Sequence, residues 1–123
     1  MDHALFQKLN VLSEQVDQNP GELAVTCSLS PDDPVFQGHF PGKPILAGAF
    51  QLSLAIHYLN KLLGLDLSIR QIKKARFKEL ILPEEPFTLM LKVLSELEMG
   101  EYKVSVKIIK DTKTITNITL FVK

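Results

Sequence analysis

The pattern of hydrophobic and polar positions changes period twice along the chain and divides it into three parts. Residues 8–29 alternate moderately on either side of a strong turn cluster, DQNPG at 17–21, and predict a β-hairpin. From about residue 49 to residue 63, apolar residues surround most of a helical projection, which predicts a largely buried helix with Gly64 as its C-terminal cap. After that the pattern becomes strand-like, with runs rich in Ile, Val, Leu, Phe and Thr. The four expected strands, which we predict to form an antiparallel meander, cover 69–82, 86–97, 101–110 and 113–122.

One helix that is apolar nearly all round must be covered on most of its surface. A sheet with one face to bury provides that cover if it wraps around the helix. Repeats, linkers and low-complexity segments are absent from the sequence. We therefore expect one α+β domain over residues 1–123, with an antiparallel sheet wrapped around a single long helix.

Charge and composition narrow the class of protein. The formal net charge is zero, so bulk electrostatic attraction to nucleic acid or to an anionic membrane is not expected. The N-terminus lacks a signal-peptide pattern and polar residues interrupt the longest apolar run, which favours a cytoplasmic protein without a membrane span. Cys27 is the single cysteine and excludes an internal disulfide, and His3, His39 and His57 are dispersed. We expect no metal and no cofactor.

The loop before the helix carries the strongest candidate chemistry. Residues 36–48 read FQGHFPGKPILAG, so His39 stands among glycines and prolines whose sterics restrict the backbone. A histidine with an ordinary pKa of about 6.5 is neutral at cytoplasmic pH and can accept a proton. The segment predicts a rigid loop that holds a proton-transfer group beside a helix N-terminus.

Two segments resemble a known family. Residues 33–45, DPVFQGHFPGKPI, followed by Gly48, are similar to the His-Phe-Pro-Gly-x-Pro loop of the hotdog-fold 3-hydroxyacyl-ACP dehydratases, the FabA/FabZ family. Residues 75–78, ARFK, followed by Leu-Pro at 82–83, resemble a strand motif of the same family. The resemblance covers roughly residues 9–122. It implies the hotdog fold and a dimer of two protomers.

The resemblance also implies a mechanism. His39 would take a proton from C2 of a 3-hydroxyacyl thioester while water leaves from C3. The backbone N–H of Gly48 would stabilise the negative charge that develops on the thioester oxygen. Helix physics agrees, because the first amides of a helix are unpaired donors at the positive end of its dipole. The residues implied to line the site for the acyl chain are Phe40, Phe50, Leu54 and Tyr58.

The sequence departs from the family where a second catalytic group is needed. The family places Glu or Asp five positions after Gly48, contributed by the other subunit, and here that position is Ser53. Serine has no useful acidity near neutral pH. His57 lies one turn beyond Ser53 and could donate the proton instead. Alternatively, His39 acts alone while Ser53 or Gln51 holds a water, or catalysis is lost and acyl binding remains.

Three further points qualify these alternatives. His57 could be a purely structural residue of the helix. Gln51 projects roughly opposite Ser53, so the two cannot point into one site. Ala47 replaces a proline usual in the family, which costs some preorganisation of the turn without removing the Gly48 donor.

The dehydratases of aryl-polyene-type clusters also keep the histidine loop and depart at the acidic position, and this chain resembles them in that respect.

Positive charge gathers on the strand that follows the helix. Lys74, Arg76 and Lys78 share one face of an extended strand at period two. An acyl carrier protein is acidic, so this stripe could be its docking surface. Lysines also keep an edge strand soluble, which is the alternative explanation.

The sequence thus predicts a homodimeric or larger hotdog dehydratase without a cofactor. It would convert 3-hydroxyacyl thioesters on an acyl carrier protein to trans-2-enoyl thioesters, in fatty-acid-type or polyene-type lipid biosynthesis. A non-catalytic acyl-carrier-binding subunit and a hotdog thioesterase are the alternatives.

Overall fold

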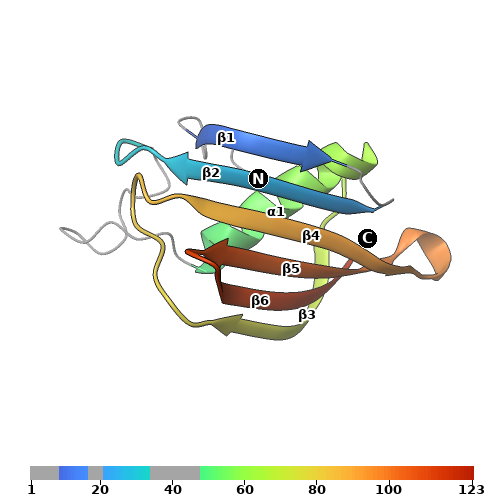
Figure 1. The fold of residues 1–123 in the computed structure, drawn as a ribbon. Helices are drawn as coiled ribbons and strands as arrows, with labels where there is room; N and C mark the ends of the chain where they lie inside the picture. Colours follow the sequence, from blue (N-terminus) through green and yellow to red (C-terminus); the bar gives the residue numbers. More distant parts are fainter. Residues whose placement is uncertain (1–8, 17–20, 34–47) are drawn as a thin grey trace.

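The computed structural model describes residues 9–16, 21–33 and 48–123. The predicted site residues His39 and Phe40 lie outside them. The described chain forms six strands and one long helix, with a single 3-10 turn (Figure 1). Their bounds are β1 Leu9–Val16, β2 Glu22–Leu29, α1 Gly48–Leu63, β3 Ile69–Phe77, β4 Phe87–Glu96, η2 Glu98–Gly100, β5 Tyr102–Lys110 and β6 Lys113–Val122.

The predicted hairpin, helix and helix cap are confirmed. Strands β1 and β2 pair antiparallel. Helix α1 ends where Gly64 takes a positive φ of 67° and donates its backbone N–H to the Asn60 carbonyl at 2.8 Å. Strands β5 and β6 are joined by Asp111 and Thr112, both with positive φ, as in a two-residue hairpin turn.

The predicted meander of the last four strands is wrong in one connection. The sheet order is β1-β2-β4-β5-β6-β3, so β3 crosses to the far edge beside β6, and β4 pairs with β2. The composition of β3 suits an edge, because eight of its nine residues are exposed and several are Lys or Arg. A central position would bury those charges. The strand also ends at Phe77, earlier than expected, and a loop over residues 78–86 leads to β4.

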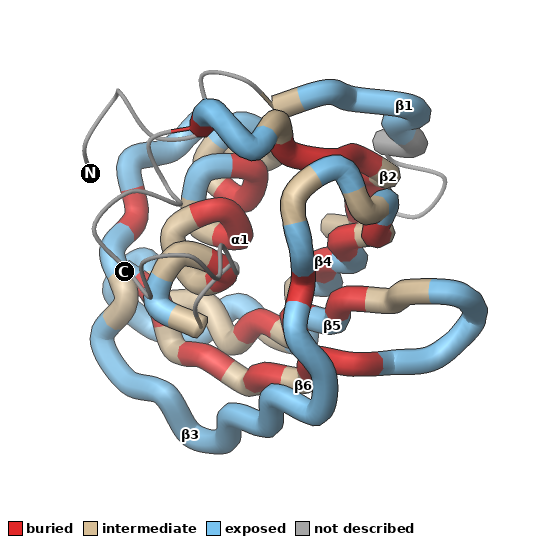
Figure 2. Tube along the Cα trace, turned by 90° about the vertical axis from the view of Figure 1, so that its left-hand side faces the viewer, coloured by how far each residue is buried: buried red, intermediate tan, exposed pale blue. Residues whose placement is uncertain are grey.

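The core lies between α1 and the concave face of the sheet, which curves around the helix (Figure 2). Helix α1 contributes Leu54, Ala55, Tyr58 and Leu59 to this core, all buried. The alternate residues of the strands supply the other side: Leu23, Val25, Leu89, Leu91, Val104, Val106, Ile108, Ile118, Leu120 and Val122. This is the arrangement of helix and sheet that the hotdog resemblance implies.

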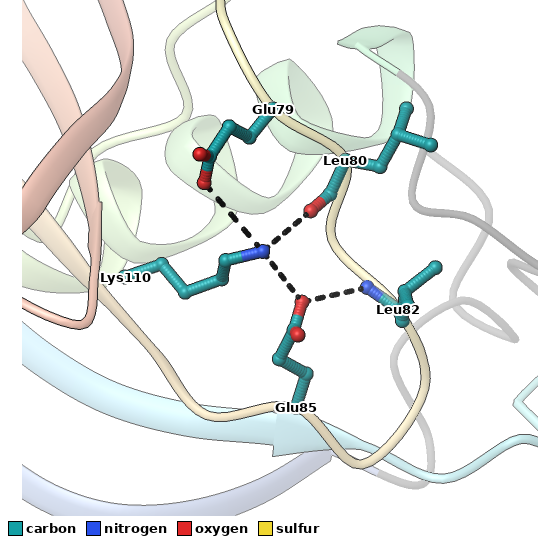
Figure 3. A network of polar contacts seen from close by, with 5 residues as sticks. All are labelled: Glu79, Leu80, Leu82, Glu85 and Lys110. Atoms are coloured by element: carbon teal, nitrogen blue, oxygen red, sulfur yellow. Dashed lines mark hydrogen bonds and ion pairs between the residues drawn. The ribbon is translucent and has the colours of Figure 1, made fainter.

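A polar cluster holds the loop between β3 and β4 against the end of β5 (Figure 3). The Lys110 ammonium donates to Glu85 Oε1 at 3.1 Å and to the Leu80 carbonyl at 3.2 Å, and it lies 3.7 Å from Glu79 Oε2. The Leu82 N–H donates to the same Glu85 oxygen. The hydrogen bond with Glu85 is the main reason that the pKa of Lys110 is raised, and burial acts in the opposite direction. Lys110 therefore keeps its proton, and the carboxylates of Glu85 and Glu79 balance its positive charge.

Cys27 is fully buried, as a small apolar residue would be, and burial raises the pKa of its thiol from 9.0 to about 12. At pH 8 the fraction of thiolate is therefore about 1000-fold smaller than for an unperturbed thiol. We expect the native protein to react with an aromatic disulfide reagent at least that much more slowly than the protein unfolded in guanidinium chloride. Rapid labelling of one thiol under native conditions would contradict this placement of Cys27.

Candidate active site

A groove of about 780 Å³ runs along α1 on the side where the helix meets the start of β3. Helix residues form one wall and the segment 66–69 forms the other. The lining combines apolar and polar side chains, as ligand sites commonly do. The lining residues are Ala49, Leu52, Ser53, Ile56, His57, Asn60, Asp66, Leu67, Ser68 and Ile69.

The groove brings together the two residues that sequence reasoning placed on one helical face. Ser53 and His57 both line it, one turn apart. The Ser53 hydroxyl donates to the Ala49 carbonyl at 3.2 Å, so it is partly engaged by its own helix. His57 is exposed, and its ring meets the Tyr58 ring edge-on with centroids 5.3 Å apart. The imidazole is thus the more available of the two groups for proton transfer.

Gln51 lies on the opposite side of the helix, as predicted. It is buried, and its Oε1 accepts a hydrogen bond of 2.7 Å from the Thr116 hydroxyl of β6. A buried hydroxyl without such a partner would cost free energy, so the pair holds the first turns of α1 against the sheet. Gln51 does not line the groove, so its side chain is not placed to hold a water there.

Asn60 shapes the far end of the groove, and sequence reasoning missed it. Its side chain donates to the Leu67 carbonyl at 3.2 Å and accepts from the Leu67 N–H at 2.7 Å. These two bonds tie the segment after the helix back onto the last turn of α1. The available signal was a polar residue four positions before the capping Gly64, near the end of the helix.

At the other end of the helix, Gly48 begins α1 in close contact with the aromatic ring of Phe77. A Cβ added at Gly48 would lie 3.0 Å from the nearest ring carbon of Phe77. As the first residue of the helix, Gly48 has an N–H without an intrahelical acceptor. The predicted oxyanion donor thus begins the helix beside the ring of Phe77. Phe77 belongs to the second family-like motif, yet its contact with Gly48 was not anticipated.

None of the predicted acyl-lining residues that the structure describes lines the groove. Leu54 and Tyr58 are buried in the core and do not line the groove, and Phe50 is half-buried and packs against the core. Burial, followed by the charges of Cys27 and Glu14, raises the pKa of Tyr58 to about 12. Their role in binding an acyl chain stays a prediction, as does that of the His39 loop.

The three predicted docking residues do lie together. Lys74, Arg76 and Lys78 line one hollow on the outer side of the sheet.

No group of three His, Cys, Asp or Glu side chains suited to a metal ion occurs within residues 9–16, 21–33 and 48–123. Among these same residues, no helix has the length and apolarity required to span a membrane.

Known proteins similar to this chain are dehydratases and hotdog-fold proteins. A FabZ 3-hydroxyacyl-[acyl-carrier-protein] dehydratase of Latilactobacillus sakei is 35% identical over 85 residues, covering 63% of this chain and 59% of the relative. A FabZ of Lactiplantibacillus plantarum is 29% identical over 92 residues, covering 68% of this chain and 63% of the relative. The chain thus spans about six tenths of the length of these curated relatives.

The solved structures agree in fold. The dehydratase heterocomplex ApeI:P of Xenorhabdus doucetiae superposes with a TM-score of 0.66 at 23% identity, covering 91% of this chain and 95% of that one. A protein of Erwinia carotovora gives a TM-score of 0.68 at 23% identity, with 94% of both chains covered. At these identities the likeness establishes the fold, which is the hotdog fold that the sequence predicted.

The sequence profile of the ApeI-like family, described as ApeI dehydratase, matches residues 14–117, which include the whole of α1 and the Ser53–His57 face of the groove. A match over most of the chain, together with the FabZ relatives and the hotdog fold, shows that the chain belongs to the ApeI-like dehydratase family.

Proposed function

We propose that this protein dehydrates 3-hydroxyacyl thioesters to trans-2-enoyl thioesters without a cofactor. The observation that carries the proposal is the groove along α1, which Ser53 and His57 both line one turn apart, on a helix that begins at Gly48. Membership of the ApeI-like family supports the reaction class. The proposal includes delivery of the substrate on an acyl carrier protein, in cytoplasmic lipid synthesis of the fatty-acid or polyene type.

In this proposal His39 removes the proton from C2, and the Gly48 N–H receives the negative charge that develops on the thioester oxygen. His57 donates a proton to the hydroxyl that leaves from C3. The arrangement needs an acid in place of the family's carboxylate, because α1 contains no Asp or Glu. Ser53 positions the leaving group or a water beside His57.

The proposal also includes a second hotdog subunit. In the family the group at the Ser53 position serves the active site of the other subunit, and the 780 Å³ groove is open to solvent in the single chain. The similar Xenorhabdus protein is described as part of a dehydratase heterocomplex, which makes a related but different chain a second candidate beside a second copy. The mass of the purified protein in solution, alone and after co-expression with a related hotdog subunit, separates these two assemblies.

A direct assay tests the reaction. The purified protein is incubated with a short 3-hydroxyacyl carrier-protein thioester, and separately with the trans-2-enoyl product. Interconversion is followed by mass spectrometry, and release of free carrier thiol is followed in parallel. We expect interconversion in both directions without thiol release. Thiol release would identify a thioesterase, and carrier binding without either reaction would identify a non-catalytic subunit.

A further inference from the structure

The outer face of the sheet carries an uncompensated cluster of positive charge. A hollow of about 180 Å³ there is lined by residues of β3, the loop after it, β5 and β6. Four of them are cationic: Lys74, Arg76, Lys78 and Lys107. The remaining lining residues are Thr114, Ile115, Thr116 and Asn117.

The pairing of the strands explains why these cations meet. Arg76 of β3 is the partner of Asn117 in β6, and Asn117 is also the partner of Lys107 in β5. The three residues therefore form a row across three adjacent strands on one face. Because neighbouring strands are about 4.8 Å apart, Arg76 and Lys107 originate about 10 Å from each other with a polar amide between them. Both side chains can reach one anionic group above Asn117.

The cations of this row differ from two other lysines of the sheet, which are ion-paired. The Lys110 ammonium forms ion pairs with Glu85 and Glu79, and the Lys92 ammonium lies 3.6 Å from Glu22 Oε1. By contrast, no carboxylate of the described residues forms an ion pair with Lys74, Arg76, Lys78 or Lys107. Four like charges around one hollow repel one another, and an external anion would relieve that repulsion.

The cluster lies on the opposite side of β3 from the contact between Phe77 and Gly48. Phe77 stands between Arg76 and Lys78 in the chain, and side chains of a strand alternate between its two faces. The Phe77 ring contacts Gly48 at the start of α1, so the flanking cations point the other way. Because β3 is the edge strand of the sheet, a partner bound to these cations sits one strand away from the N-terminus of the helix.

We propose that Arg76 and Lys107, on either side of Asn117 and flanked by Lys74 and Lys78, form the docking surface for the acidic face of an acyl carrier protein. The proposal rests on the proposed function for the identity of the partner. A second copy of this chain fits the surface poorly, because it would bring the same cations. Nucleic acid fits poorly as well, because the formal net charge of the chain is zero.

The experiment compares one acyl group on two carriers. A 3-hydroxyacyl group is supplied either on holo acyl carrier protein or as its N-acetylcysteamine thioester, which lacks the protein. For Arg76→Glu combined with Lys107→Glu, we expect KM for the carrier-bound substrate to rise at least tenfold, with the loss confined to that substrate. The control is Lys103→Glu, a single Lys-to-Glu reversal like that at Lys107 but on the outer face at the other end of β5, and we expect it to change KM less than about twofold. Raised salt screens charge attraction, so it should increase the KM of the unmodified protein for the carrier-bound substrate and leave KM for the N-acetylcysteamine thioester unchanged.

Direct binding keeps this test separate from the test of catalysis. Fluorescence anisotropy of labelled holo carrier protein is measured with the unmodified protein and with both variants. If the protein binds the carrier and the double variant does not, the docking surface stands even when no turnover is found. Equal binding by the double variant, equal loss with both thioesters, or equally effective competition by inorganic phosphate or by a single-stranded oligonucleotide would overturn it.

Discussion

Alanine in place of His39 is expected to lower kcat for dehydration about 10⁴-fold, and alanine in place of His57 about 100-fold, since positioned general acids and bases contribute about 10²–10⁴ each. Ser53→Ala should cost less than about threefold. The Ser53 hydroxyl is not an acid at neutral pH, and it already donates to the Ala49 carbonyl. His57, by contrast, is exposed in the same groove. Single-turnover and steady-state rates with one 3-hydroxyacyl thioester measure the three variants side by side.

Folding and chemistry can be separated in these variants. Because His57 and Ser53 are not in the core, we expect their substitutions to change the free energy of unfolding by no more than about 0.5 kcal/mol. A further variant, Ser53→Glu in the His57→Ala background, returns the family's carboxylate and should recover at least tenfold in kcat. If Ser53→Ala removes turnover while His57→Ala retains it, the proton donor is assigned wrongly.

Proline in place of Gly48 is expected to lower kcat about 100- to 1000-fold, which is the usual cost of removing one oxyanion donor. The substitution removes the N–H and leaves the helix largely intact, because proline is tolerated in the first turn, where the N–H has no intrahelical acceptor. The thermal midpoint of unfolding should therefore fall by only a few degrees, whereas kcat falls by the full 100- to 1000-fold. Rates and thermal unfolding of the same preparation check both halves of this expectation.

Gly48→Ala is the matched control, because it adds the Cβ and keeps the N–H. That Cβ would lie 3.0 Å from the Phe77 ring, so the ring must move by a few tenths of an ångström. Phe77 is 44% exposed and has room to do so. We expect Gly48→Ala to retain kcat within about threefold. Equal losses for Gly48→Ala and Gly48→Pro would mean that the contact with Phe77, and not the N–H, is what the site requires.

The elements and the family could be predicted from local sequence features. The change from period two to helical period marks α1 to within one residue, and Gly64 ends it because its left-handed conformation suits a helix cap. The dense glycine and proline motif around His39 and the ARFK segment were sufficient to identify the family. The opposite orientations of Gln51 and Ser53 followed from the helical angle alone.

Strand partners could not be predicted in the same way, because alternation within a strand determines which side chains share a face and not which strand lies alongside. The edge position of β3 beside β6 depends on the crossover and on burial across the whole sheet. Only that pairing brings Lys107 to Arg76 across Asn117, although the residues are 31 positions apart in sequence. The placement of helix residues shows the same limit, since only the packing of the sheet decides that Leu54 and Tyr58 are buried in the core and do not line the groove.

The sequence by itself therefore determined the helix, most of the strands and the family, and it supplied the candidate site residues, because these depend on neighbours along the chain. Only the tertiary structure decided which face of α1 remains open as a groove, that the Phe77 ring contacts Gly48, and that four cations line one hollow with no carboxylate among its described lining residues. These features arise from contacts between segments distant in sequence. Their geometry is set by how the sheet curves around the helix, which no local pattern encodes.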